Sequence, residues 1–460
     1  MTTTSLDSTA LRSALDRSAV LVPDDEAYEA ARTIAPGGVD WRPAAIVRPT
    51  DSAGVAQAVR FARDTGLELA VRAGGHSALG LGRDHGALTI DLRGLESLEI
   101  AEDGRSAWAG GGLTAGAYTA AVGAHGLATP FGDTATVGIG GLTLGGGVGF
   151  LSRSRGMTID SLLAAEVVTA DGEVVVADAE HHPDLFWGLR GGGGNLGVVT
   201  RFRYALHEVS SVVGGMLMLP ATAESVAGVV AAADAAPREL TVILMVMSAP
   251  PAPFIPAEWH GRIIVMAHLC WSGDPEAADA ALAPLRAVAT AAGGAIMDGI
   301  HAGPYAGLFE GGPAGGHVVA VGRPFYADAI DIAAAAHMVE QLESSDAMMR
   351  GVQLRVLGGA VADVPDDATA YAHRGARIMG ASSAVAPTVE AARGYTSFVE
   401  ALADRLRDGR DGAYVNFVGD GDPALAAAAY PGATGERLAQ VKRTYDPDNV
   451  FRANLNVQPA

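Results

Sequence analysis

Cysteine is nearly absent from this chain of 460 residues, in which Cys270 is the only one. A single cysteine excludes an intramolecular disulfide and a metal site built from several thiolates, and no metal site is expected. The chain has no run of roughly 18 apolar residues, so we expect neither a transmembrane helix nor a membrane partner. Residues 1–25 lack the charged-then-apolar pattern of a secretion signal, which makes a cytoplasmic location the expectation.

Positive charge is scarce as well. The sequence has 32 Lys and Arg residues against 52 Asp and Glu residues, which gives a formal net charge of −20. This balance argues against a general nucleic-acid binder, although a small anionic cofactor could still be held locally. Aromatic residues make up 6% and hydrophobic residues 49% of the chain, a composition that indicates a folded protein, and the length indicates two or three domains.

Glycine is abundant, and its first cluster follows a strand. Residues 67–72 alternate between apolar and polar side chains, and Gly74, Gly75 and His76 come directly after them. Two glycines let the backbone turn sharply and expose successive N–H groups, which suits a phosphate. His76 would then lie beside whatever carries the phosphates. A tight turn followed by a surface histidine explains the stretch equally well.

The surrounding segments predict regular elements. Residues 44–49 and 67–72 are expected strands on either side of a helix that begins near Asp51 and ends at Gly66, which makes a β-α-β unit. Asp171 and Gly172 predict the turn of a β-hairpin. A short helix is expected over residues 183–190, with proline in its first turn.

A second glycine-rich segment spans residues 132–149, and a third spans residues 191–197. Backbone without side chains can approach a flat or extended ligand closely. Val137, Ile139 and Leu142 are interleaved with these glycines and would anchor the segment in a core, which disfavours a floppy loop.

The composition changes after residue 208. Alanine-rich helices expected at residues 274–292 and 327–343 alternate with expected strands at residues 241–246 and 262–267. This pattern predicts a second domain of α+β type, in which helices cover one sheet.

The C-terminal part offers polar side chains for a ligand. We expect a strand at residues 414–417 and a helix at residues 435–445, which Pro447 helps to end. Asn454 and Asn456 would lie on one face of an extended tail and could hydrogen-bond a polar ring. Ordinary turn and edge chemistry is the alternative.

Together these motifs resemble the FAD-linked oxidoreductases of the vanillyl-alcohol oxidase/PCMH superfamily, in the berberine-bridge-enzyme-like group that includes bacterial 6-hydroxynicotine oxidases. The resemblance extends from about residue 41 to 459 and rests on residues 72–77, 137–149, 184–200 and 445–456. It implies the fold class α+β, with a PCMH-type FAD-binding domain of two α/β subdomains and an α+β substrate domain. The segments would be residues 1–207 (FAD domain), 208–411 (substrate domain) and 412–460 (returning to the FAD domain).

The resemblance also implies how the cofactor is held. The histidine that matches His76 bonds covalently to the flavin, and a cysteine that adds a second bond in many relatives is replaced by Thr134. A single covalent bond is therefore expected, with Arg72 assisting the backbone N–H groups at the pyrophosphate. The implied FAD contacts are Arg72, Ala73, Gly74, Gly75, His76, Ser77, Gly80, Asp133, Thr134, Val137, Gly138, Gly141, Gly145, Gly146, Gly147, Val198, Asn454 and Asn456.

The implied activity is that of an oxidase. It would remove a hydride from a C–H next to O or N of a small alcohol or amine, such as a secondary metabolite, and pass electrons to O2 to give H2O2. Valine at position 137 accompanies oxygen use in such relatives. The candidates for catalytic groups are Tyr414, Gln353, Arg355 and Asn456; an adjacent Arg355 would lower the pKa of Tyr414. Simple packing of Tyr414 against the flavin, or an amine that needs no base, stays open.

Other functions remain possible on the sequence. A flavoprotein could have a non-redox role, as a cyclase scaffold or a flavin-binding module, or it could be a dehydrogenase that does not use O2. An NAD enzyme is disfavoured because the Gly-Gly-His turn lacks the spaced glycines of the dinucleotide fingerprint. A small-molecule substrate and O2 are the expected partners, and the chain is expected as a monomer or homodimer.

Overall fold

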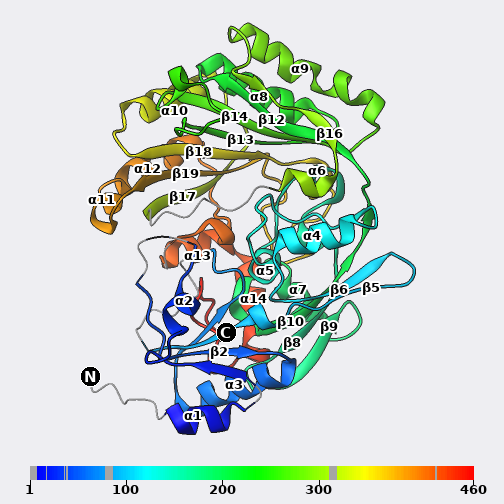
Figure 1. Ribbon diagram of the computed structural model, residues 1–460, viewed down its shortest axis with the longest axis vertical. Helices are drawn as coiled ribbons and strands as arrows, with labels where there is room; N and C mark the ends of the chain where they lie inside the picture. Colours follow the sequence, from blue (N-terminus) through cyan, green and yellow to red (C-terminus); the bar gives the residue numbers. More distant parts are fainter. Residues whose placement is uncertain are drawn as a thin grey trace.

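The computed structural model describes residues 8–16, 18–35, 37, 40–77, 86–309, 319–419 and 422–460. Three main sheets organise these residues, and the third lies at the far end of the molecule from the first (Figure 1). No helix in the described ranges is long and apolar enough to cross a membrane.

The first sheet contains the predicted β-α-β unit. Its strand order is β1-β2-β4-β3, and β4 runs parallel to both β2 and β3. The connecting helix begins where Asp51 accepts a hydrogen bond from the N–H of Gly54 and ends at Gly66, whose φ is 72°. The unit is confirmed. The elements here are α1 (Ser8–Ala14), β1 (Ser18–Leu21), α2 (Tyr28–Arg32), β2 (Ala45–Pro49), α3 (Ser52–Thr65), β3 (Leu69–Arg72) and β4 (Leu88–Asp91).

The second sheet is antiparallel, with the order β5-β6-β10-β8-β9. The hairpin predicted around Asp171 and Gly172 is confirmed as the β8–β9 connection, and the helix predicted with Pro183 at its start is confirmed as α7. The elements are β5 (Leu98–Ile100), β6 (Ser106–Gly110), α4 (Ala115–Gly123), α5 (Ile139–Leu144), α6 (Ser152–Arg155), β8 (Leu162–Val168), β9 (Val174–Asp178), α7 (Pro183–Leu189) and β10 (Val198–Ala205), with β7 (Leu127–Ala128) paired to β11 (His207–Glu208).

The third sheet has eight described strands, ordered β15-β12-β14-β13-β18-β19-β17 with β16 beside β12. Helices cover one face, and Val226, Leu282 and Met338 from these helices share a core with Leu244 and Leu354 of the sheet. The predicted α+β class is confirmed. The elements are β12 (Val212–Pro220), α8 (Ala223–Ala235), β13 (Leu240–Ser248), β14 (Ile263–Trp271), α9 (Ala278–Ala291), β15 (Met297–Asp298), β16 (His301–Gly303), β17 (Val319–Ala327), α10 (Ile332–Ser344), β18 (Met349–Val356), β19 (Ile378–Ala386), α11 (Val389–Arg393) and α12 (Thr396–Leu406).

Two predicted elements differ most from the structure. The helix expected to begin at residue 327 begins at Ile332, because residue 327 ends strand β17 and the Asp331 carboxylate caps the helix by accepting from Ala334 N. Residues 414–417 are not a strand. They form a 3-10 turn (Val415–Phe417) in which Phe417 N donates to Tyr414 O, so this segment pairs with no sheet.

The C-terminal segment folds back onto the second sheet. After α13 (Pro423–Ala429) and α14 (Ala433–Tyr445), the tail is held by Asn195, whose amide donates to Leu455 O and accepts from Val457 N. Lys442, fully buried, donates to Asn195 O and pairs with Asp446 at 2.8 Å. The segment limits at residues 207 and 411 stay predictions.

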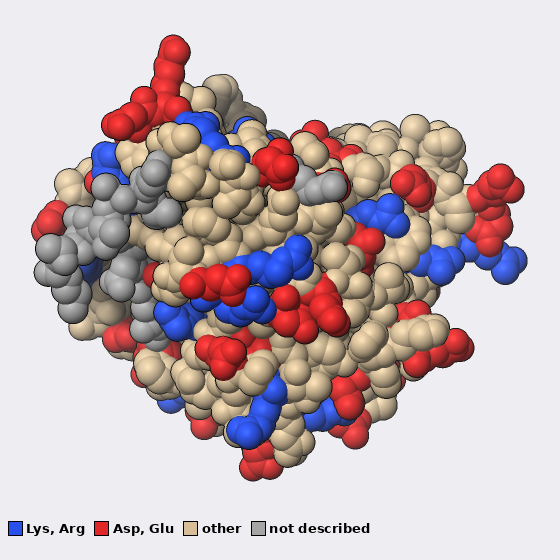
Figure 2. Space-filling model, turned by 90° about the horizontal axis from the view of Figure 1, so that it is seen from below, with Lys and Arg blue, Asp and Glu red and all other residues tan. Residues whose placement is uncertain are grey.

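The surface reflects the composition. On the face drawn in Figure 2, acidic side chains are scattered among the basic ones rather than separated from them. Several surface charges are paired, as in the contact of 2.6 Å between Arg12 and Asp25.

Candidate functional site

A cavity of about 520 Å³ lies where the three sheets meet. Its wall comes from the end of β3 and the following turn, the glycine-rich residues 132–144, the start of β10, strand β18, the 3-10 turn and the C-terminal tail. Of the predicted contacts, the lining includes Arg72, Ala73, Gly74, Gly75, His76, Ser77, Asp133, Thr134, Val137, Gly138, Gly141, Val198, Gln353, Arg355, Tyr414 and Asn454. Sequence positions far apart are thus brought into one site.

The turn after β3 is packed against the second glycine-rich segment. A Cβ on Gly74 would lie 2.2 Å from Gly138 N. Neither glycine can therefore be replaced without displacing the backbone segment that contains the other. Gly75 has a φ of 73°, a conformation that a residue with a side chain seldom adopts. The cavity wall is therefore bare backbone here, as a phosphate cradle requires.

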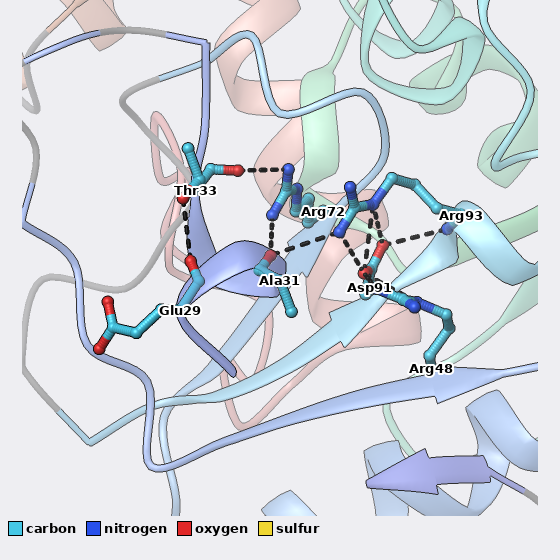
Figure 3. Close-up of polar contacts among 7 residues, drawn as sticks. All are labelled: Glu29, Ala31, Thr33, Arg48, Arg72, Asp91 and Arg93. Atoms are coloured by element: carbon cyan, nitrogen blue, oxygen red, sulfur yellow. Dashed lines mark hydrogen bonds and ion pairs between the residues drawn. The ribbon is translucent and has the colours of Figure 1, made fainter. Parts of the chain in front are cut away.

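Arg72 braces this turn from behind. Its guanidinium donates to the carbonyl groups of Ala31 and Thr33, the latter at 2.6 Å, at the C-terminal end of α2 (Figure 3). Burial lowers the pKa of Arg72 to about 10, and Asp91 lies nearby, paired with two other arginines. Each terminal nitrogen donates to one carbonyl, and Nε has no hydrogen-bond partner in the described part of the chain, so Arg72 braces the turn and its assistance at a pyrophosphate stays a prediction.

His76 faces the cavity with one ring nitrogen engaged. Its Nε2 lies 3.0 Å from Thr136 Oγ1, and the backbone of Thr136 also hydrogen-bonds the ring. Burial lowers the pKa of His76 below its usual 6.5, which keeps the ring neutral. With the proton on Nε2, Nδ1 carries the lone pair that a bond to a group in the cavity needs.

An ion pair crosses the cavity between the second and third sheets. Asp133, beside Thr134, lies 2.8 Å from Arg355 Nη2 on β18. Arg355 also donates to Val148 O, and its side chain is only 6% exposed. The pair leaves this part of the cavity close to neutral.

Tyr414 has both hydroxyl lone pairs occupied. Its oxygen accepts from Gly147 N at 2.9 Å and from Asn416 Nδ2 at 3.1 Å. Burial raises the pKa of Tyr414 above 10; the two hydrogen bonds and Arg355 oppose this without cancelling it. Arg355 lowers the pKa of Tyr414 as expected, but burial outweighs it and the net shift is upward. With both lone pairs used, the hydroxyl proton is free to point to another acceptor.

The site contains one polar residue that sequence reasoning missed. Asn416 donates to Leu142 O as well as to Tyr414, and its amide oxygen lies 2.1 Å from where a Cβ on Gly145 would stand. Residues Gly145, Gly146 and Gly147, predicted as contacts, are not part of the cavity lining; Gly145 makes room for Asn416, whereas Gly146 and Gly147 make room for Met157 and Thr158. The signal was the position of Asn416, two residues after Tyr414.

The two C-terminal asparagines occupy different environments. Asn454 lines the cavity and donates to Gly194 O at 2.8 Å, whereas Asn456 is not part of the wall. The chain bends over residues 453–455, so the prediction of one shared face was wrong. Each amide Oδ1 is buried without a hydrogen-bond partner in the described part of the chain. Gly80, also predicted as a contact, lies outside the described residues.

Two family descriptions match the chain. Residues 43–178 match an FAD binding domain, and residues 413–458 match berberine and berberine-like proteins. Over 457 residues the chain is 30% identical to (R)-6-hydroxynicotine oxidase of Paenarthrobacter nicotinovorans, with 96% of each chain covered. It is 28% identical to glucooligosaccharide oxidase of Sarocladium strictum, over 95% of this chain and 91% of that relative.

Solved structures share the fold. The crystal structure of 6-hydroxy-D-nicotine oxidase from Arthrobacter nicotinovorans superposes with a TM-score of 0.82 at 26% identity, covering 96% of this chain and 98% of that chain. Glucooligosaccharide oxidase from Acremonium strictum, described with a 6-S-cysteinyl, 8α-N1-histidyl FAD, gives a TM-score of 0.86 at 24% identity over 98% and 99% of the chains.

The residues of this cavity fit such a cofactor. FAD is a flat ring joined through two phosphates to adenosine, and the cavity offers a bare glycine turn, a neutral histidine beside it and an unpaired amide oxygen of Asn454. The chemistry of these groups suits a polar ring and an anionic linker. Over the described ranges, no group of three or more His, Cys, Asp or Glu side chains is arranged to hold a metal ion.

Proposed function

We propose an oxidase function for this chain, which belongs to the berberine-bridge-enzyme-like FAD-linked oxidoreductases of the vanillyl-alcohol oxidase/PCMH superfamily. The reaction would remove a hydride from a C–H beside the oxygen or nitrogen of a small alcohol or amine. Its electrons would pass to O2 and give H2O2. Relatives named as oxidases of 6-hydroxynicotine and of glucooligosaccharides support the reaction type.

The cofactor would be held at both ends of the cavity. The N–H groups of Gly74 to Ser77 would bind the pyrophosphate, and the Asn454 amide would bind a polar edge of the ring. His76 would form the covalent bond through Nδ1, because Nε2 is the nitrogen that contacts Thr136 Oγ1. When bound, FAD supplies the acceptor for the hydride and the route for electrons to O2.

The observation that carries the proposal is the Tyr414 hydroxyl in the wall of the same cavity. Two N–H donors, from Gly147 and Asn416, fix its oxygen. The same two donors would stabilise a tyrosinate, which could then take the proton from a substrate O–H or N–H as the hydride leaves. Gln353 lines the cavity from strand β18 and accepts a hydrogen bond from Arg355; it would orient the substrate from this side of the cavity.

Oxygen use is proposed from Val137. This side chain lines the cavity from the glycine-rich segment, and it is smaller than a leucine at the same position would be. A smaller side chain leaves more room for O2 beside the cofactor.

The test is anaerobic mixing with a panel of alcohols and amines, followed by admission of oxygen. Loss of the flavin absorbance on mixing, and equimolar H2O2 once air enters, is the expected result. Bleaching without H2O2 would favour a dehydrogenase. A flavin that no member of a broad panel reduces would favour a non-redox role and contradict the proposal.

A further inference from the structure

The face of the third sheet that looks toward the cavity is rich in methionine. The opposite face lies under α8, α9, α10 and α12, which Leu244 and Leu354 contact (Figure 1). Because side chains alternate along a strand, Met245 and Gln353 point away from these helices. Gln353 lines the cavity, so this face borders it.

Strand register places six side chains in one row across this face, in the order Met297, Met218, Met266, Met245, Gln353 and Ala381. Directly opposed residues on antiparallel strands have Cβ atoms about 5 Å apart, so the row is a continuous surface. The row therefore runs from Gln353, which lines the cavity, onto four methionines that are not themselves part of the cavity lining.

The burial of this row identifies where it is accessible. Met218 and Met266 are buried, at 0% and 8% exposure, and Ile255 of the β13–β14 loop packs against them. Met245, directly beside Gln353, is partly exposed, as is Met247 in the next row. Met247 lies over Gly351. A Cβ added to Gly351 would stand only 2.8 Å from the Cβ of Met247.

Charge is nearly absent from this face. Over the described strands β13, β14, β18 and β19, the positions on this side carry one permanently charged side chain, Arg355, and Asp133 neutralises it. Near Met245 and Met247 the polar side chains are Gln353 and Ser383. Trp259 of the β13–β14 loop packs against the same methionine cluster, so the surface is apolar and offers few hydrogen-bond partners to an oligosaccharide. Methionine offers a deformable apolar contact instead.

We propose that the substrate of this enzyme carries an uncharged apolar group, an alkyl chain or fused ring, that packs on Met245 and Met247 while its reacting carbon lies below Gln353. This rests on the proposed oxidase function and adds the substrate class to it. The same surface disfavours substrates that are charged at this end.

Binding tests the proposal without turnover. The neutral probe N-phenyl-1-naphthylamine fluoresces in apolar sites and is titrated into the holoenzyme, Met245→Gln, Met247→Gln and the control Met348→Gln, whose parent side chain is 50% exposed elsewhere. We expect one site in the wild type and the control, and at least tenfold weaker binding in both sheet variants, with unchanged thermal unfolding. No binding, or equal binding in all four proteins, overturns the proposal.

A substrate series separates this inference from the proposed function. Within alcohols or amines that share one reacting group, kcat/KM should rise about fourfold for each added methylene, and the rise should flatten in Met245→Gln. A sugar oxidised more efficiently than every apolar member overturns the inference and leaves the oxidase function standing. If the probe binds at the sheet but no substrate reduces the flavin, the apolar binding surface stands and the proposed oxidase function fails.

Discussion

Replacing Tyr414 by phenylalanine should slow substrate oxidation far more than it weakens the fold. The substitution removes the oxygen that accepts from Gly147 N and Asn416 Nδ2. Leaving buried donors unpaired costs about 1–3 kcal/mol of stability. Loss of a proton acceptor costs about 10²–10⁴-fold in rate, which at 1.4 kcal/mol per factor of ten is about 3–5.5 kcal/mol.

The assay is anaerobic stopped-flow reduction of the flavin with a substrate found by H2O2 release. Because burial raises the pKa of Tyr414 above 10, the tyrosinate fraction grows throughout the range below that value. The wild-type rate should therefore still rise at pH 10, and the rate of Tyr414→Phe should be independent of pH.

A matched control is Tyr371→Phe. This tyrosine is also buried, accepts a hydrogen bond from Tyr326, and does not line the cavity. The Tyr371→Phe variant should be less stable than the wild type, and its rate of flavin reduction should stay within about threefold of the wild-type rate. If Tyr414→Phe also reacts within threefold of wild type, or keeps the alkaline rise, Tyr414 is not the proton acceptor.

Three further predictions follow from single residues. Val137→Leu should lower the rate of reoxidation by O2 at least tenfold in stopped flow, with the reduction rate unchanged; equal reoxidation would refute gating at this position. Lys442→Met should lower the free energy of unfolding in urea by about 3–5 kcal/mol because it strands the buried Asp446 carboxylate, and a change below 1 kcal/mol would contradict this. Covalent FAD incorporation into apoprotein should be constant from pH 8 to 6.5 and fall only at lower pH, since burial lowers the pKa of His76; a midpoint above 6.5 would contradict a neutral ring.

Local sequence predicted the parts of the site that local rules control. The β-α-β unit that ends at the Gly74–Gly75 turn follows from alternation, an N-cap at Asp51 and a C-cap at Gly66. The periodicity of the sequence after residue 208 likewise predicted the strands and helices of the third sheet. The starts of α9 and α10 lie four and five residues later than predicted, and at α10 the reason is that a strand with alanine at its end resembles the beginning of an alanine-rich helix.

The contacts that tune the site could not be read from the sequence. Arg355 and Asp133 pair across 222 positions, and Asn416 bonds to Leu142 across 274. The pKa of Tyr414 depends on its burial, which no local pattern reports. The bend before Asn456 arises because Asn195, in the turn before β10, holds the tail at Leu455 and Val457.

The covalent attachment of FAD at His76 is the central claim, and mass spectrometry of the digested protein tests it most directly. After precipitation in acid, the peptide that contains His76 should carry the mass of one FAD, and His76→Ala should release all flavin into the supernatant. A single flavin bond is expected, since the family resemblance implies that Thr134 replaces the cysteine that forms the second bond. Flavin that dissociates freely from the denatured wild type, or that remains bound to His76→Ala, would contradict the account.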